Sequence, residues 1–389
     1  MNLNFYNCPK PAELDETVLP KTVPFLNYVP DFKLLEDFKS AYANYKNILV
    51  IGHGGSITSL DGFYNALKLN TELKEIFFLS TTDPDYLHYL KCKLSPSETL
   101  VLAISKSGEN ITQLEMLSQF LDFPILVITQ KSSPLRALAE KLKLKIVTHP
   151  NIGGRFTGLT EVGLLPASIS GIEVKSIFAG ASKVYAQFFK NNSAWELASV
   201  LYQLEQQGFV DVFMPVYSQA LYAFNKIIVQ LCHESFGKAG KGQTFFAHES
   251  PESQHHTNQR FFGGRKNICG LFISQQLYNN NLVVSYPPPV HSVQIKGHIL
   301  FDINKIPLSQ SIHSELIGTL QNARVTNVPS MHLDLPQISP ESLGEFLAFW
   351  QVFAVYAAVL RQVDPFDQPQ VENSKNISFT HRLNLKGIL

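Results

Sequence analysis

Short apolar runs that alternate with stretches of helical spacing constrain the fold of this chain more than any other feature. In the first half the runs are Asn47–Ile51, Glu75–Ser80, Thr99–Ile104, Pro124–Thr129 and Lys145–Thr148. Helical patterns cover residues 112–121 and 134–142 between them. Strands that alternate with helices form βαβ units, and such units build a parallel sheet with helices on its faces. The first half therefore predicts an α/β architecture.

The same alternation of strand and helix patterns occurs in the second half. Apolar runs at 210–215, 269–274 and 298–302 predict strands, and helical spacing at 220–235 and 341–361 predicts helices. We expect an α/β protein of two doubly wound domains, with mainly parallel five-stranded sheets flanked by helices. The predicted parts are an irregular or helical segment at 1–45, where five prolines interrupt long elements, a first domain at 46–165, a second at 166–340, and C-terminal helices at 341–389.

Composition excludes several classes of protein. Lys plus Arg and Asp plus Glu each number 32, so the neutral chain has no overall basic footprint for nucleic acid. Charged residues make up 16%, too few for general disorder, and no uninterrupted apolar run approaches the roughly 18 residues of a membrane span. The first residues lack the pattern of a signal peptide, so we expect a cytoplasmic protein without membrane partners. Its four cysteines form no C-x-x-C pair and are expected to be unpaired thiols.

Two loops follow predicted strands, at the sheet edge where open parallel sheets bind ligands. Gly52–Ser56 carries three glycines, which let a backbone approach an anion closely, although a plain tight turn has the same composition. Ser105–Asn110 carries two hydroxyls, the Lys106 ammonium and a glycine, a combination that suits a phosphomonoester. The alternative is an ordinary serine cap of the next helix. Neither loop has the glycine spacing of a nucleotide-binding motif.

Four further segments carry candidate chemistry. Arg155 follows Gly153-Gly154 and is either a rigid cation for a developing oxyanion or a surface arginine of an interdomain loop. Glu234 lies one helical turn after Gln230 and is either a base in a cleft or a solvated carboxylate. The stretch around His255 could be read as a metal site or as an acid–base group, and Lys375 as an ordinary exposed lysine.

Together these segments resemble glucose-6-phosphate isomerases of the sugar-isomerase (SIS) fold, in the right order from about residue 47 to 375. The chain is shorter than most members. The matching stretches are Gly54-Gly55-Ser56, Ser105-Lys106-Ser107, Ile152-Gly153-Gly154-Arg155-Phe156-Thr157, Gln230-x-x-x-Glu234-Ser235-x-Gly237-Lys238, Gln254-His255-x-x-x-Gln259 and Phe366-Asp367-Gln368-x-x-Val371-Glu372-x-x-Lys375. Three positions depart from the family pattern: Asn110 replaces a threonine of the phosphate loop, with Thr112 two residues later, Gln370 replaces a glycine, and Pro150 replaces an acidic residue.

The resemblance implies interconversion of glucose 6-phosphate and fructose 6-phosphate in glycolysis and gluconeogenesis, through a cis-enediolate, with no metal or other cofactor. It implies Glu234 as the base, Arg155 beside the enediolate, and His255 and Lys375 in ring opening. It also implies a homodimer in which His255 comes from the neighbouring subunit. The implied substrate-binding residues are Ser105, Lys106, Ser107, Asn110 and Thr112 at the phosphate, with Gly54, Ser56 and Gln230 at the sugar.

Two other functions remain open at this point. One is a bifunctional phosphoglucose/phosphomannose isomerase, since the same base could serve both epimers. The other is a sugar-phosphate-binding regulator without catalysis, which would need Ser105 and Ser107 but neither Glu234 nor Lys375. The presence of all the implied catalytic residues favours an enzyme over the regulator.

Overall fold

The computed structural model describes residues 1–388, and its two five-stranded sheets confirm the predicted fold class. The first sheet is entirely parallel, and its strands, in spatial order, are β3 (Glu75–Leu79), β2 (Asn47–Ile51), β4 (Thr99–Ile104), β5 (Ile125–Thr129) and β6 (Lys145–Thr148). All five strands lie where the apolar runs predict them. The boundaries given above for the domains, at residues 45, 165 and 340, stay predictions.

The second sheet is parallel except for one edge. Its order is β8 (Thr244–Glu249), β7 (Asp211–Tyr217), β9 (Ile268–Leu277), β12 (Ser330–Gln337) and β1 (Asn2–Tyr6), with β1 antiparallel to β12. The sequence predicts β7 and β9 but not β8, β12 or β1. Strand β1 comes from the start of the chain and pairs with β12, the last strand in the sequence. The segment before residue 45 is therefore not uniformly irregular.

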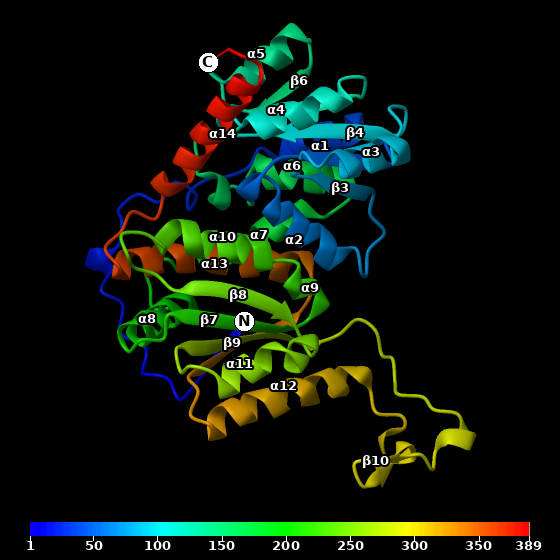
Figure 1. Ribbon diagram of the computed structural model, residues 1–389, viewed down its shortest axis with the longest axis vertical. Coiled ribbons are helices and arrows are strands. Elements are labelled where there is room, and N and C mark those ends of the chain that lie inside the picture. Colours follow the sequence, from blue (N-terminus) through cyan, green and yellow to red (C-terminus); the bar gives the residue numbers. More distant parts are fainter. Residues whose placement is uncertain (389) are drawn as a thin grey trace.

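Helices cover both faces of both sheets, so the molecule is a stack of layers (Figure 1). Alternate residues of each strand of the first sheet point to an outer core under α3–α5 or to an inner core shared with the second sheet. The second sheet has its own outer core under α11 and α12. The helices are α1 (Phe32–Ala41), α2 (Thr58–Leu67), α3 (Pro84–Lys93), α4 (Ile111–Leu117), α5 (Pro134–Lys141), α6 (Glu161–Ser170), α7 (Val174–Tyr185), α8 (Ser193–Gln206), α9 (Gln219–Tyr222), α10 (Asn225–Phe236), α11 (Thr257–Gly263), α12 (Leu308–Val325), α13 (Pro340–Leu360) and α14 (Glu372–Leu385).

Two predicted elements differ from the structure. The helix at 220–235 is interrupted at Ala223–Phe224, where the Phe224 ring is packed edge-on against Phe63 and Phe346, with centroids 5.5 and 5.4 Å away. The strand at 298–302 is wrong. Only β11 (His298–Ile299) pairs there, with β10 (Gln294–Ile295), because this segment lies in a projecting loop whose apolar side chains face outward instead of into a sheet core.

The long helix α13 is the centre of the inner core. By length and composition it could cross a membrane, but 83% of its most apolar window is buried inside the protein, as expected of a core helix. It crosses α7 so closely that their backbones touch. A Cβ added to Gly344 would lie 1.8 Å from the carbonyl oxygen of Ile177, and one added to Gly180 would lie 2.0 Å from that of Glu341. Glycine at both positions therefore sets the distance between the two helices.

The close crossing of α7 and α13 predicts that one added methyl group at the contact lowers stability. Gly344→Ala should lower the free energy of unfolding by about 1–3 kcal/mol or more, because the helices must separate to admit the Cβ. Gly318→Ala is the matched control, since nothing lies within 4 Å of its added Cβ on the exposed face of α12. That substitution should raise stability by about 0.5–1 kcal/mol. Urea unfolding of both variants checks the prediction, and equal effects would contradict it.

Candidate active site

Two glycine-containing turns meet at the carboxyl edge of the first sheet. A 3₁₀ turn at Gly54–Ser56 follows β2, and another at Gly154–Phe156 follows β6. A Cβ on Gly55 would lie 2.1 Å from the carbonyl carbon of Gly154, so the two backbones touch. Gly54 has φ +51°, and a Cβ there would lie 2.7 Å from Nε2 of Gln230. Glycine at these positions lets the backbone turn and also lets neighbouring groups come close. As a result, the Gly54–Ser56 turn packs against Arg155 and helix α10.

Arg155 is buried, with 1% of its surface exposed, so the surface-arginine alternative is wrong. Its Nε donates to Oγ of Ser235 at 2.8 Å, and its Nη1 donates to Oε2 of Glu234 at 3.2 Å and Oε1 of Gln368 at 2.7 Å. Its Nη2 donates to the backbone carbonyls of Glu234, Pro365 and Asp367. Burial lowers the pKa of Arg155, and the Glu234 carboxylate acts in the opposite direction, favouring the charged guanidinium.

Glu234 is held between a cation and an amide. Its Oε2 faces Arg155, while Oε1 accepts a hydrogen bond of 3.0 Å from Nε2 of Gln230, one turn earlier on α10. The contact between Gln230 and Glu234 confirms that they share a helix face, as their spacing predicts. The side chain keeps 26% of its surface exposed. Glu234 is therefore fixed in direction yet open to a ligand, and the reading as a freely solvated carboxylate is wrong.

Two cations hold the segment Asp364–Gln368 next to Arg155 and Glu234. Besides Arg155, the Lys238 ammonium donates to the Asp367 carbonyl at 2.7 Å and contacts both the Asp367 carboxylate and the carbonyl of Asp364. The ring of Phe366 packs edge-on against Phe156, with centroids 5.6 Å apart. The C-terminal signature and the Gly-Gly-Arg signature, some 210 residues apart, thus form one wall of the site.

The predicted phosphate loop curls back on itself after β4. The hydroxyl oxygen of Ser105 accepts from the backbone N–H of Gly108 at 3.0 Å, and that of Ser107 accepts from Glu109 at 3.3 Å. Gly108 has φ +65°, which closes the turn. Asn110, and not a serine, caps α4 by accepting from the N–H of Gln113, so the alternative of a serine cap is wrong. Both serine hydroxyls keep their own protons to donate to a ligand.

His53 joins this loop to the Gly54–Ser56 turn. Its Nδ1 lies 3.4 Å from Nδ2 of Asn110 and its Nε2 lies 3.4 Å from Oγ1 of Thr112. Burial lowers the pKa of His53, the carbonyl of Ser80 raises it, and the charge of Lys375 lowers it further.

Lys375 stands on a helix that is weakly attached to the rest of the protein. Its Nζ pairs with Oε1 of Glu372 at 2.8 Å, and its side chain is 53% exposed. No residue of α14 is buried. The helix is tied to α4 by a bidentate ion pair in which Arg382 donates to both carboxylate oxygens of Glu115, at 2.6 and 2.9 Å.

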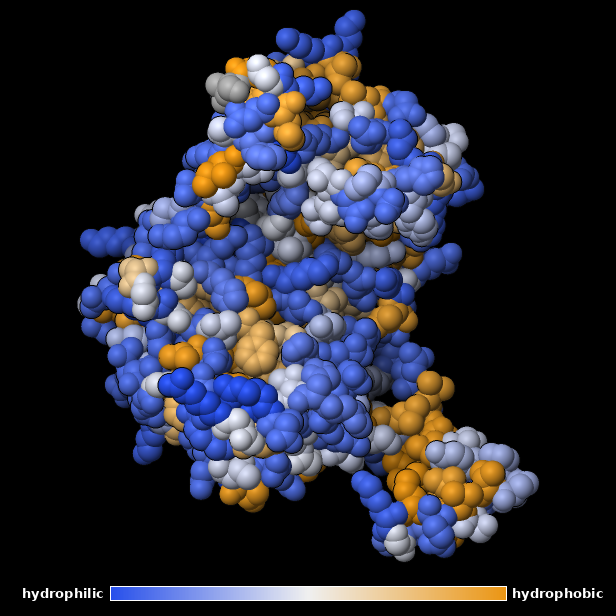
Figure 2. Space-filling view, viewed as in Figure 1, coloured by the Kyte–Doolittle hydropathy of each residue, from blue (hydrophilic) through white to orange (hydrophobic). Residues whose placement is uncertain are grey.

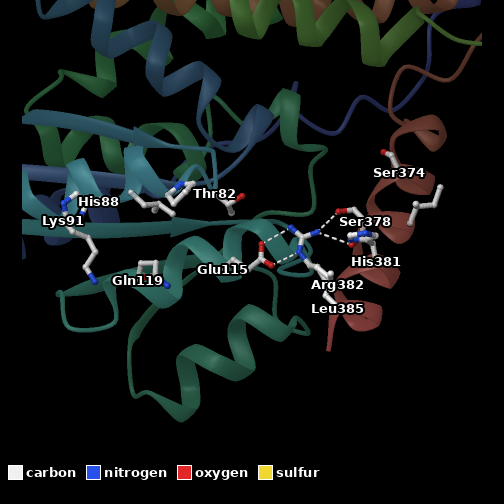
Figure 3. Close-up of a pocket in the computed structure, with 13 residues that line it drawn as sticks. Thr82, His88, Lys91, Glu115, Gln119, Ser374, Ser378, His381, Arg382 and Leu385 are labelled. Atoms are coloured by element: carbon white, nitrogen blue, oxygen red, sulfur yellow. Dashed lines mark hydrogen bonds and ion pairs between the residues drawn. The ribbon is translucent and has the colours of Figure 1, made fainter. Parts of the chain in front are cut away.

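A cavity of about 1080 Å³ lies between α14 and helices α3 and α4 (Figure 3). Ser374, Ser378, His381 and Arg382 line it from α14, and His88 and Lys91 line it from α3. The cavity does not include Arg155, Glu234 or the loop at 105–110. We place the candidate chemistry at the latter residues, because there buried charge and converging polar groups coincide, whereas the cavity is a gap left by a loosely packed helix.

The structure does not bring His255 to this site within one chain. His255 ends a short 3₁₀ turn after β8 and is exposed, and its neighbour Gln254 donates to the Tyr217 hydroxyl at 3.1 Å. Within residues 1–388, no hydrogen bond or ion pair links His255 to Arg155, Glu234 or Lys375. Nor does any group of three or more His, Cys, Asp or Glu in that range have the placement of a metal site.

Sequence reasoning missed several residues that build the site. Ser235, Gln368 and Lys238 stand inside quoted motifs, but nothing in one sequence shows that they hold Arg155 and the segment Asp364–Gln368 in place. His53 stands in the glycine-rich loop without a predicted role, because the direction of a side chain leaving a turn is not readable from composition. All four cysteines are free, as predicted.

Comparison with known proteins agrees with this fold and these motifs, although no family model matches the chain. The chain is 28% identical over 395 residues to the glucose-6-phosphate isomerase of Carboxydothermus hydrogenoformans, covering 91% of this chain and 83% of that protein. It is 27% identical over 356 residues to that of Listeria monocytogenes serotype 4b, covering 84% and 78%. The resemblance to glucose-6-phosphate isomerases is confirmed over most of the chain.

Solved structures show the same fold. A hypothetical protein from Thermus thermophilus superposes with a TM-score of 0.82 at 26% identity, covering 90% of this chain and 86% of that one. A glucose-6-phosphate isomerase from Chlamydia trachomatis superposes with a TM-score of 0.78 at 20% identity, covering 92% and 73%. These likenesses confirm the predicted sugar-isomerase fold.

The role of Arg155 as the tie between α10 and the segment Asp364–Gln368 predicts a specific loss. Arg155→Lys keeps the charge but removes the planar fork, so buried carbonyl oxygens lose donors at a cost of about 1–3 kcal/mol. We expect faster hydrogen exchange at 366–368 and a lower midpoint of urea unfolding. Arg265→Lys, at an exposed position, is the control and should change stability by about 0.5 kcal/mol or less. Unchanged exchange at 366–368 would contradict the assignment.

Proposed function

We propose that this protein interconverts glucose 6-phosphate and fructose 6-phosphate, as an intramolecular oxidoreductase acting through a cis-enediolate. The observation that carries the proposal is the carboxylate of Glu234, partly open to solvent and paired with the buried guanidinium of Arg155. The names of the relatives support the same reaction. Moving hydrogen between C1 and C2 needs a base that accepts and returns one proton, together with positive charge beside the oxygens of the intermediate.

Glu234 fits the role of the base. Gln230 and Arg155 fix its two oxygens, so the carboxylate needs no reorientation when the sugar arrives. Taking a proton from C2 of the open-chain aldose leaves negative charge on the enediolate oxygens. Arg155 stands beside Glu234 and can stabilise that charge, an electrostatic contribution of a few kcal/mol in a water-poor site, roughly 3–4 for a single donor.

The phosphate group serves as a handle on the substrate. We assign it to the hydroxyls of Ser105, Ser107 and Thr112, the Asn110 amide and the Lys106 ammonium, with Gly54, Ser56 and Gln230 placing the sugar. Burial lowers the pKa of Lys106. Binding energy from the phosphate, remote from the reacting carbons, then holds C1 and C2 against Glu234. Lys375 and His255 are assigned to ring opening, which requires proton transfer at the ring oxygen and the C1 hydroxyl.

We also propose a homodimer, in a cytoplasmic enzyme of glycolysis and gluconeogenesis. The exposed position of His255 supports it, because one chain leaves this residue away from Glu234. A projecting loop at 278–307 gives a second argument. It extends from the second sheet and shows a concentration of apolar surface (Figure 2). Its exposed apolar side chains are Leu282, Val283, Tyr286, Val293, Ile295 and Phe301. Apolar surface of this kind is stabilised when a second subunit covers it.

The decisive experiment is a coupled assay that converts fructose 6-phosphate to glucose 6-phosphate. Glu234→Gln keeps the shape of the side chain and removes the base, so kcat should fall by about 10²–10⁴. Glu72→Gln, at an exposed position away from the site, is the control and should leave kcat unchanged. A loss below about tenfold in Glu234→Gln would show that another group is the base.

The same assay separates the alternatives. No turnover by the wild-type protein would favour a sugar-phosphate-binding regulator, and turnover of mannose 6-phosphate would favour the bifunctional isomerase. The presence of Glu234, Arg155 and Lys375 together is the reason to expect turnover of fructose 6-phosphate.

The shared site predicts complementation between two inactive variants. His255→Gln and Glu234→Gln each lose activity when pure. After the two are unfolded together and refolded as a mixture, heterodimers have one intact site, so about one quarter of wild-type activity should return if each site takes Glu234 from one subunit and His255 from the other. A mixture that stays inactive, although sedimentation shows dimers, would contradict a site shared between subunits.

A further inference from the structure

His53 is the titratable side chain at the candidate site to which the proposed mechanism gives no role. It leaves the turn after β2 and meets two side chains of α4, with Nδ1 at 3.4 Å from Asn110 Nδ2 and Nε2 at 3.4 Å from Thr112 Oγ1. The Thr112 hydroxyl donates its own proton to Oδ1 of Asn110 at 2.5 Å. The three side chains therefore form a small ring of hydrogen bonds at the mouth of the predicted phosphate loop.

These two side-chain contacts favour one neutral tautomer of the imidazole. The amide nitrogen of Asn110 can only donate, so Nδ1 accepts from it and carries no proton. The Thr112 oxygen has already donated its proton, so Nε2 carries a proton and donates to it. The arrangement suits a neutral ring. A protonated His53 would place an N–H opposite the N–H of Asn110, which disfavours the charged form while the site is empty.

The other charges and dipoles that act on the imidazole come from two other elements. Lys375 on α14 acts on it from one side, with Glu372 paired to that ammonium, and the backbone carbonyl of Ser80 acts on it from the end of β3. The ammonium and burial disfavour a proton on His53, and the carbonyl favours one. A phosphate dianion bound at the loop 105–112 would reverse this balance, because it offers the Asn110 amide a new acceptor and brings negative charge to the imidazole.

We propose that His53 is a further phosphate-binding residue, which lies against Asn110 and Thr112 and takes up one proton from solvent when the phosphate group of the substrate binds. The proposal rests on the proposed function for the identity of the sugar. The binding of an anion at this loop does not depend on which sugar carries it. The proposal also explains how a loop with Asn110 in place of threonine can hold a phosphate. The Oδ1 of Asn110 accepts from the Thr112 hydroxyl and from the N–H of Gln113, so the amide N–H groups of Asn110 remain to donate to the phosphate.

The direction of the pH effect follows from linkage. In the free protein the pKa of His53 lies below its ordinary value of 6.5, so the ring is neutral near pH 7. A bound anion raises the pKa of His53. The affinity for the anion therefore increases as the pH falls from the pKa of His53 in the complex towards its pKa in the free protein. Inorganic sulfate is the suitable probe, because it keeps both charges across this range and any pH dependence belongs to the protein.

The test is calorimetric titration of the full-length protein with sodium sulfate. If binding raises the pKa of His53 by about one unit, the wild-type Kd should be about threefold or more lower at about pH 6 than at about pH 8. Heats measured in two buffers of different ionisation enthalpy should show net proton uptake near pH 6. His53→Gln keeps hydrogen-bonding groups but cannot titrate, so both effects should disappear. His313→Gln, at an exposed position on α12, is the control and should retain them.

A second measurement does not depend on the variant binding sulfate. The imidazole resonance of His53, assigned by its absence in His53→Gln, should titrate with a higher midpoint when sulfate is present. An unchanged midpoint, absence of sulfate binding, or an equal pH dependence in wild type and His53→Gln would overturn the proposal. Turnover of fructose 6-phosphate by the wild-type protein is independent of these results. Turnover without proton uptake would refute only the role of His53, and uptake without turnover would refute only the isomerase.

Discussion

The buried guanidinium of Arg155 is the interaction on which the site depends. Its N–H groups reach the side chains of Glu234, Ser235 and Gln368 and the backbone of the segment Asp364–Gln368. A charge at 1% exposure is costly unless its donors are used, and here they are. The same group therefore joins helix α10 to the C-terminal part of the chain and is the positive charge that we propose for the enediolate. Loss of Arg155 would therefore affect both the packing of the segment Asp364–Gln368 and the proposed catalysis.

The site has a rigid side and a loosely held side. Glu234, Gln230 and Arg155 stand on α10 and on a turn packed backbone to backbone against Gly55, so their positions are fixed before a ligand arrives. Lys375 stands on α14, which buries no residue and is tied to α4 through Arg382 and Glu115. Few buried apolar contacts mean low local stability. This division suits a reaction in which proton transfer needs exact alignment, while ring opening needs a group that can follow the substrate.

The sequence predicts the first sheet well because its three inner strands, β2, β4 and β5, are buried on both faces and read as apolar runs. The second sheet is harder to predict. Strand β12 alternates polar and apolar residues, and β1 is an antiparallel addition from the far end of the chain. Residues 298–302 look like a buried strand but lie in the projecting loop after Gly297, which has φ +84°. Apolar composition cannot distinguish a core strand from an exposed surface that another subunit could cover.

The site was predictable where its geometry is local. Gln230 and Glu234 are one helical turn apart, and their hydrogen bond follows from that spacing. The partners that hold Arg155 were not predictable, because Ser235 and Gln368 are 80 and 213 positions away from it. Contacts across such distances follow from packing of the two sheets and the helices between them. His255 has no hydrogen bond or ion pair with Glu234 within the described chain, and the proposed second subunit is one on which a single sequence carries no geometric information.

The central claim is that a carboxylate moves a proton, and not a hydride, between C1 and C2 of the sugar. Isomerisation of fructose 6-phosphate in D₂O tests it directly, with the product analysed by NMR at C2. A proton held by Glu234 can exchange with solvent before it returns, so the account predicts deuterium at C2 of the glucose 6-phosphate formed. Product that forms at the normal rate with only protium at C2, under conditions in which Glu234 exchanges with solvent within each turnover, would contradict it.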